Sequence, residues 1–234
     1  DGTLELQLTG AGMVVSGNGA LNGVPLKFNW EENFSAAAFI RRFTVSGVVG
    51  ASARRKLGID DIPVGTGDIA GEVKHTIFPG GRSESIAKFD LTKAALEAPV
   101  IQWRKAADVP GNLYLFMIEK PSGEVVVEDL RLEAGDLRLE ARIEAKPDLR
   151  SFQTLEFRNL AFSGNSMKGH VRVADDGGFD IQLTGERIDL SSFLNKEDEV
   201  DAVAVDKGLA LRIQASFDEV LLGSGRRLRD VKAL

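Results

Sequence analysis

The sequence predicts an all-β protein that is mainly antiparallel and contains a few short helices. Apolar and polar residues alternate with a period of two along almost the whole chain of 234 residues. Turn-forming residues separate these runs, and the 25 glycines suit tight turns and sheet curvature better than helices. We expect an extended curled sheet or β-groove, with a closed β-sandwich as the alternative, because periodicity does not say what covers the apolar side.

The first predicted strand lies at the amino terminus. Leu4, Leu6 and Leu8 alternate there with Glu5 and Gln7. This is the pattern of a strand with one apolar face and one face in water.

Two hairpins are predicted further along the chain. In the first, apolar alternation leads into Gly135-Asp136 and continues over residues 137–143, beginning with Leu137 and Leu139. In the second, residues 171–173 lead into a turn of two aspartates and two glycines, and residues 179–183 lead away from it. Short strands joined by such turns indicate antiparallel neighbours.

The longest clean alternation runs from residue 209 to residue 217, and Leu209, Leu211, Ile213 and Phe217 share its apolar face. Three short segments are predicted to be helical connectors. They are residues 51–57, residues 91–96 after an Asp90 cap, and residues 190–194 after Asp189.

The bulk composition argues against several classes of function. A net charge of -6 leaves no basic surplus for phosphate backbones, so we expect no nucleic-acid partner. The absence of cysteine rules out disulfides and thiolate metal sites. The two histidines, His75 and His170, are better explained as structural or surface residues than as ligands or bases.

No catalytic motif is present in the sequence. The glycine clusters at residues 17–23 and 65–71 read G-x-G-x-x-x-G, one residue too long for a dinucleotide loop, and neither opens a helix. The acid pairs Asp60-Asp61 and Asp175-Asp176 lack the spacing of a calcium loop. We therefore expect a protein without catalytic residues, metal or cofactor.

A sheet of on the order of fifteen strands has an apolar face too long for three short helices to cover. A second sheet, closure into a barrel, or an apolar ligand would each solve this problem. The basic group Arg226, Arg227 and Arg229 is compatible with lipid headgroups, although charges on an edge strand also discourage edge pairing.

Residues 67–111 carry a resemblance to a known family. They contain Phe89-Asp90-Leu91-Thr92, then Pro99, then Trp103 and Lys105, and finally Pro110-Gly111. This run resembles the central part of AsmA-like proteins, the bridge-like lipid-transfer proteins of the YhdP and TamB type. Residues 168–194 are similar to the same family's pattern of a strand pair that ends in a short helix led by Asp-Leu.

The resemblance implies that residues 1–234 are a single β-groove segment of a longer protein of the cell envelope. Such proteins are anchored in the inner membrane by flanking regions, cross the periplasm, and serve outer-membrane biogenesis by conducting phospholipid acyl chains. A non-catalytic β-sandwich that acts as a spacer or interaction module is the alternative function.

The candidate lipid-binding residues are apolar residues of the alternating strands, and core packing is the alternative role for each of them. They are Leu4, Leu6, Leu8, Leu137, Leu139, Leu209, Leu211, Ile213 and Phe217.

Overall fold

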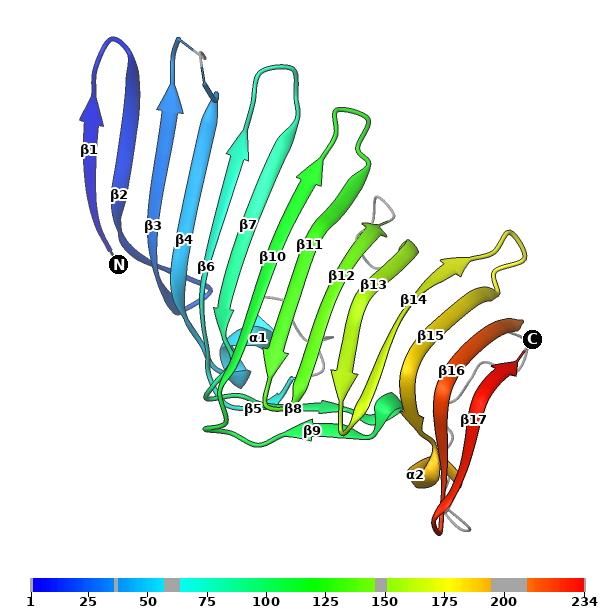
Figure 1. The fold of residues 1–234 in the computed structure, drawn as a ribbon. Helices are drawn as coiled ribbons and strands as arrows, with labels where there is room; N and C mark the ends of the chain where they lie inside the picture. The colour runs from blue at the N-terminus through cyan, green and yellow to red at the C-terminus, as the bar shows by residue number, and fades with distance from the viewer. Residues whose placement is uncertain (1, 36–37, 57–63, 146–150, 195–209, 234) are drawn as a thin grey trace. The chain divides into compact units, whose positions relative to one another are not determined.

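The computed structural model describes residues 2–35, 38–56, 64–145, 151–194 and 210–233. In these residues it has seventeen strands, two α-helices and one 3-10 helix. Fourteen strands form one large sheet, and three form a small one (Figure 1).

The elements up to residue 105 are β1 (Thr3–Leu8), β2 (Gly12–Leu21), β3 (Val24–Asn33), β4 (Arg41–Val49), α1 (Ala51–Lys56), β5 (Val64–Thr66), β6 (Ile69–Ile77), β7 (Ser83–Asp90), β8 (Ala95–Ala98), the 3-10 helix η1 (Pro99–Ile101) and β9 (Trp103–Lys105). The remaining elements are β10 (Gly111–Glu119), β11 (Val125–Ala134), β12 (Leu137–Ala145), β13 (Phe152–Phe162), β14 (Asn165–Val173), β15 (Phe179–Asp189), α2 (Ser191–Leu194), β16 (Leu211–Gly223) and β17 (Arg226–Ala233).

The strands of the large sheet follow one another almost in chain order, β1-β2-β3-β4-β6-β7-β10-β11-β12-β13-β14-β15-β16-β17. The small sheet has the order β5-β8-β9. The large sheet is not closed, and β1 and β17 are its edges. The prediction of an all-β extended sheet is confirmed, and the closed sandwich is not the fold.

One pair of strands departs from the antiparallel rule. β16 runs parallel to β15, with Ile181 opposite Ile213. The chain between these strands includes α2 and is longer than the dozen residues that a parallel crossover needs. The predicted hairpin over residues 171–183 is confirmed, because Val171 pairs with Ile181 in antiparallel register.

Two of the three predicted helices are confirmed, as α1 and α2. The prediction for residues 91–96 was wrong. The backbone N–H of Thr92 donates to Asp90 Oδ1 at 2.8 Å, which makes a turn, and the chain then enters β8. β8 pairs with β5, and these ladder bonds outweigh a helix too short to be stable by itself.

The chain divides into two compact units. The first unit comprises residues 1–97 and 104–135, and the second comprises residues 98–103 and 136–234. The expectation that residues 1–234 form a single groove segment stays a prediction.

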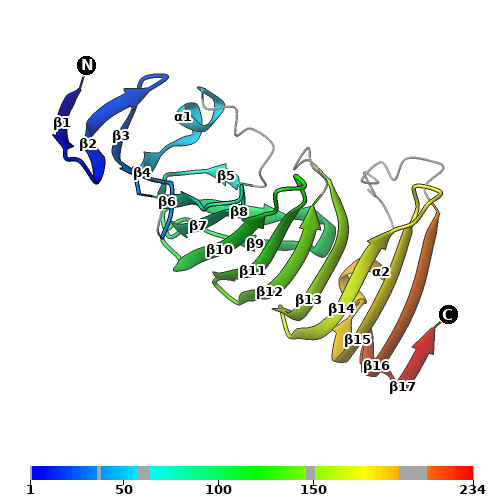
Figure 2. The ribbon, with the colours of Figure 1, turned by 90° about the horizontal axis from the view of Figure 1, so that it is seen from above.

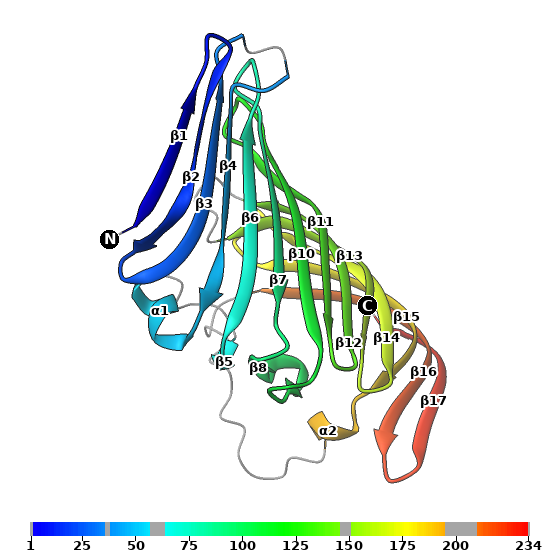
Figure 3. The same cartoon turned by 90° about the vertical axis from the view of Figure 1, so that its left-hand side faces the viewer.

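In the first unit, the strand pairs β1/β2, β3/β4, β6/β7 and β10/β11 are joined at one end, at the top of Figure 1. We call this the hairpin end, and the opposite end the α1 end. Figure 3 shows α1 beside the lower ends of β3 and β4. The side chain of Asn22, in the turn between β2 and β3, donates to the Lys56 carbonyl at 2.9 Å and so ties α1 to this end. Seen from above, α1 and β5 lie on the same side of β4 and β6 (Figure 2).

The loop that follows β7 packs on the first unit at the α1 end. A Cβ placed on Gly111 would lie 3.2 Å from Leu91 Cβ and 3.1 Å from Lys105 Cε, so glycine permits this close approach. Lys105 is only 3% exposed, and its side-chain ammonium donates hydrogen bonds to four backbone carbonyls. Burial lowers the pKa of Lys105 from its usual value.

In the second unit, two hydrogen bonds to the carboxylate of Asp136 connect separate parts of the chain. Trp103 Nε1 donates to Asp136 Oδ1 at 2.8 Å, and the backbone N–H of Ser163 donates to Asp136 Oδ2 at 2.9 Å. These hydrogen bonds lower the pKa of Asp136, with that from Trp103 the largest cause. Trp103 is buried, and Trp30 is the only other tryptophan in the sequence.

Candidate functional site

The strand register places apolar side chains from every large-sheet strand of the first unit on one face. Residues directly opposite each other in antiparallel strands point to the same side of a sheet. One row, which we call the middle row, crosses all eight strands of the large sheet in this unit without a polar side chain. It consists of Leu4, Gly17, Phe28, Val45, Val73, Ala87, Leu115 and Leu130.

Part of this apolar face of the first unit is open to solvent, mainly along β1, whereas Ala87 in the middle row is buried. Leu4, Leu6 and Leu8 of β1 are 62%, 60% and 65% exposed, and Val45 and Val73 in the middle row are also exposed. The opposite face is mainly polar over β1 to β6, whereas Ile86 and Phe116 make it partly apolar further along. Exposed apolar side chains gathered on one face of a sheet mark a binding site or an aggregation hazard.

The second unit separates its two faces more completely. An apolar row crosses β12 to β16 through Ile143, Leu155, Val171, Ile181 and Ile213. The rows on the opposite face are polar throughout. They consist of Glu144, Thr154, Arg172, Asp180 and Arg212, and of Arg142, Glu156, His170, Gln182 and Gln214.

Five of the nine sequence-predicted lipid residues lie exposed on an apolar face. Leu4, Leu6 and Leu8 share the apolar face of the first unit, and Leu211 and Ile213 share that of the second, where they are 48% and 45% exposed.

The other candidates are less accessible. Leu137 and Phe217 are buried, and Leu139 is half-buried. Phe217 lies over Gly185, where a Cβ would come within 2.8 Å of its ring. Core packing therefore accounts for Leu137 and Phe217, while Leu209 lies outside the described residues.

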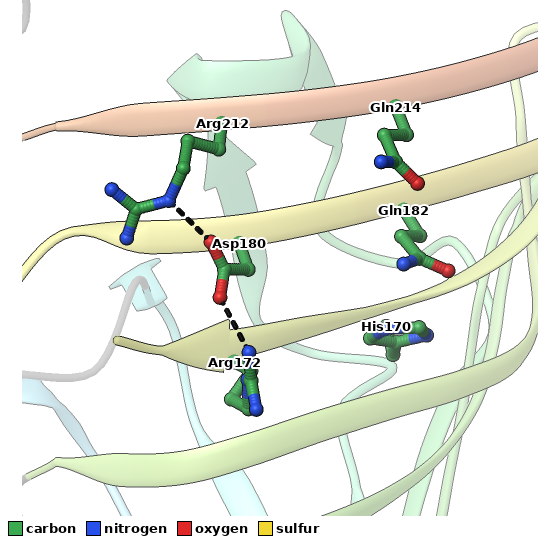
Figure 4. Close-up of a pocket in the computed structure, with 6 residues that line it drawn as sticks. All are labelled: His170, Arg172, Asp180, Gln182, Arg212 and Gln214. Atoms are coloured by element: carbon green, nitrogen blue, oxygen red, sulfur yellow. Dashed lines mark hydrogen bonds and ion pairs between the residues drawn. The ribbon is translucent and has the colours of Figure 1, made fainter. Parts of the chain in front are cut away.

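A polar hollow of about 490 Å³ lies on the other face of the second unit (Figure 4). Asp180 sits between two guanidinium groups, at 2.6 Å from Arg212 Nε and 2.7 Å from Arg172 Nη2. Arg212 also contacts Asp176, at 2.9 Å. The remaining lining residues are His170, Gln182 and Gln214.

The charges in this hollow are already compensated. Its two arginines are both paired with acids, and none of the lining residues is a serine, threonine or lysine beside a base. The hollow thus offers no nucleophile with an activating partner. We regard its ion pairs as cross-strand contacts that stabilise β14 to β16.

The Asp176–Arg212 pair makes a testable contribution to acid stability. Hydrogen bonds from Arg212 lower the pKa of Asp176 from 3.8 to about 2. Because the folded-state pKa lies below the unfolded one, this stabilisation is present above pH 3.8 and is lost as the pH falls through about 2. We expect Asp176→Asn to lower the thermal unfolding midpoint at neutral pH, with the difference disappearing towards pH 2. A difference that persists unchanged in acid would contradict this assignment.

The two histidines lie on different faces and in different units. His75 lies on the apolar face of the first unit, opposite Phe43 and Ser85, and its Nδ1 is 2.8 Å from Ser85 Oγ. His170 lies on the polar face of the second unit. Asp60-Asp61 falls outside the described residues, and Arg227 pairs with Glu219 at 3.3 Å.

Within the described ranges, there is no cluster of acids and histidines that suits a metal ion. In the same part of the chain, neither α1 nor α2 is long and apolar enough to span a membrane.

Sequence reasoning missed a set of polar residues on the apolar face of the first unit. Glu32, Arg41, Ser83 and Glu119 form a row there, in register across β3, β4, β7 and β10, with Ile77 of β6 between Arg41 and Ser83. We call these four residues the polar row. Each strand contributes a single residue to the row, and the strands are far apart in the sequence, so the register alone reveals the row.

Comparisons of the chain with protein-family models, curated protein sequences and solved structures yield no match.

Proposed function

We propose that this chain binds the acyl chains of phospholipids on the apolar faces of its sheet, as one segment of a lipid-conducting path between the inner and outer membranes. A periplasmic location and anchoring to the inner membrane through flanking regions belong to the same proposal. The resemblance of residues 67–111 and 168–194 to AsmA-like proteins supports it.

The observation that carries the proposal is the middle row of the first unit. Eight neighbouring strands present it without a polar side chain, and Val45 and Val73 within it are exposed. Acyl chains that lie on such a surface are shielded from water at about 0.8 kcal/mol per CH₂ group. Transfer between a bilayer and this surface then has little net cost, and the protein need form no bond with its ligand.

Fluorescence of Trp30 tests this proposal directly. Trp30 lies on the apolar face of the first unit, opposite Val15 and Phe43. In a Trp103→Phe variant it is the only tryptophan. We expect a phospholipid with a nitroxide near the end of its acyl chain to quench Trp30 strongly, because nitroxides quench only at close range.

The matched control is Trp30→Phe, which leaves Trp103 as the sole reporter. Trp103 is buried and hydrogen-bonded to Asp136, so we expect the same lipid to quench it weakly. Equal and weak quenching of both tryptophans in folded protein would contradict lipid binding and favour a spacer module.

A further inference from the structure

The apolar face of the first unit changes in polarity along the strands. Near the hairpin end lies the polar row, Glu32, Arg41, Ser83 and Glu119. Arg41 donates to Glu32 through Nε at 2.6 Å and through Nη2 at 2.8 Å, and Ser83 Oγ donates to Glu119 Oε2 at 3.2 Å. The fork from Arg41 lowers the pKa of Glu32 and raises that of Arg41, so both are charged. Charged groups, together with the buried hydroxyl of Ser83, therefore interrupt a mainly apolar face near the hairpin end.

The next row towards the α1 end is amphipathic. It contains Trp30, Phe43, His75 and Ser85. The rings of Trp30 and Phe43 stack with centroids 5.8 Å apart, while Trp30 Nε1 donates to Glu32 Oε2 at 3.0 Å. Trp30 thus points its polar atom at the polar row and keeps its ring among apolar neighbours. Aromatic rings with one polar edge take this position at the boundary between lipid headgroups and acyl chains.

Beyond this boundary the face is apolar. The middle row follows, and the row after it includes Leu26, Phe89 and Leu113. At the α1 end the face is covered, because Leu91 and Lys105 pack against Gly111. From the hairpin end to the α1 end, the surface over β3 to β10 passes from charged to amphipathic to apolar, whereas on β1 and β2 the row in register with Glu32 carries Leu8 and Met13.

A phospholipid has the same order of polarity from its headgroup to its chain ends. We propose that a phospholipid bound to the first unit lies along the strands, with its headgroup at the polar row and its acyl chains directed towards the α1 end. This inference rests on the proposed function and adds an orientation that acyl-chain binding alone does not require. The opposite orientation would place charged oxygens on Leu26 and Leu113 without hydrogen-bond partners.

Three tryptophan reporters on one face of β3 test this orientation. The first is Trp30 in the Trp103→Phe background. The second and third carry Phe28→Trp or Leu26→Trp together with Trp30→Phe and Trp103→Phe. Residues 26 and 30 are about 13 Å apart along a strand. The probes are two phosphatidylcholines, one with a nitroxide on its headgroup and one with a nitroxide at the end of an acyl chain.

We expect the headgroup nitroxide to quench Trp30 more than the chain-end nitroxide does. The order should reverse for the Leu26→Trp reporter, and the Phe28→Trp reporter should fall between the two. Gly19 leaves room beside Phe28, since a Cβ on Gly19 would still be 3.8 Å from the Phe28 ring. The Phe28→Trp variant can therefore replace Leu26→Trp in the comparison with Trp30 if Leu26→Trp does not fold.

The two levels of the proposal fail in different ways. If neither lipid quenches any reporter in folded protein, the proposed function is wrong. Quenching by the chain-end nitroxide would show that lipid binds. If the ratio of headgroup to chain-end quenching were then the same at all three reporters, or rose from Trp30 to the Leu26→Trp reporter, the orientation would be wrong.

Discussion

Replacing Val45 by glutamate is expected to weaken phospholipid binding by at least about tenfold, equivalent to about 1.4 kcal/mol. Val45 is exposed in the middle row of the first unit, between Phe28 and Val73. A carboxylate there would have to lose water when acyl chains cover it, and burying an unpaired charge costs several kcal/mol. The measurement is a titration with phospholipid that carries a nitroxide at its chain end. It is made on the Trp103→Phe protein with and without Val45→Glu, and quenching of Trp30 fluorescence reports the binding.

The matched control for this variant is Val48→Glu. Val48 is an exposed valine of the same strand, but it lies on the opposite face, where it pairs with Ala70. The chemical change and the change in net charge are identical in the two variants. We expect Val48→Glu to leave the affinity nearly unchanged, and equal losses in both variants would contradict binding on the face that carries Val45.

Replacing Lys105 by methionine is expected to lower the free energy of unfolding by about 3 kcal/mol. The ammonium donates to the carbonyls of Ala94 and Val109 at 2.7 and 2.8 Å, and to those of Ala106 and Thr92 at 3.0 and 3.3 Å. Methionine fills a similar volume but leaves these carbonyls without that donor. Urea unfolding followed by circular dichroism measures the loss.

Lys93→Met is the control for this second variant. Lys93 pairs with an acid instead, Asp108 at 2.6 Å, and both side chains are largely exposed to water. Exposed ion pairs contribute at most about 1 kcal/mol, so we expect a small change. If Lys105→Met proved no more destabilising than Lys93→Met, the four hydrogen bonds from Lys105 to backbone carbonyls would not be what stabilises the loop at the α1 end.

The sequence predicted which face of a strand each side chain occupies better than it predicted which strands pair with each other. Alternation put Leu4, Leu6 and Leu8 on one side of a strand, and the register of β1 with β2 agrees. The same alternation in residues 211–217 is compatible with either strand direction, which is why the parallel pairing of β15 and β16 was not predicted. Alternation shows where a side chain points, whereas the neighbouring strand is chosen by contacts far away in the chain.

The candidate site shows the same limit. Ser83 and Glu119 are 36 residues apart, and only the pairing of β7 with β10 brings their side chains together. Burial is equally hard to predict from one strand, since Phe217 continues the alternation of Ile213 but lies against Gly185. The helix expected at residues 91–96 failed because Asp90 caps a turn as well as it caps a helix.

Native mass spectrometry of the purified, folded protein after incubation with phospholipid vesicles tests the central claim most directly. Acyl-chain binding predicts adducts whose masses match whole phospholipids, and these adducts should be depleted in Val45→Glu but not in Val48→Glu. Folded protein that remains free of lipid under these conditions, or adducts equally abundant in both variants, would contradict the account.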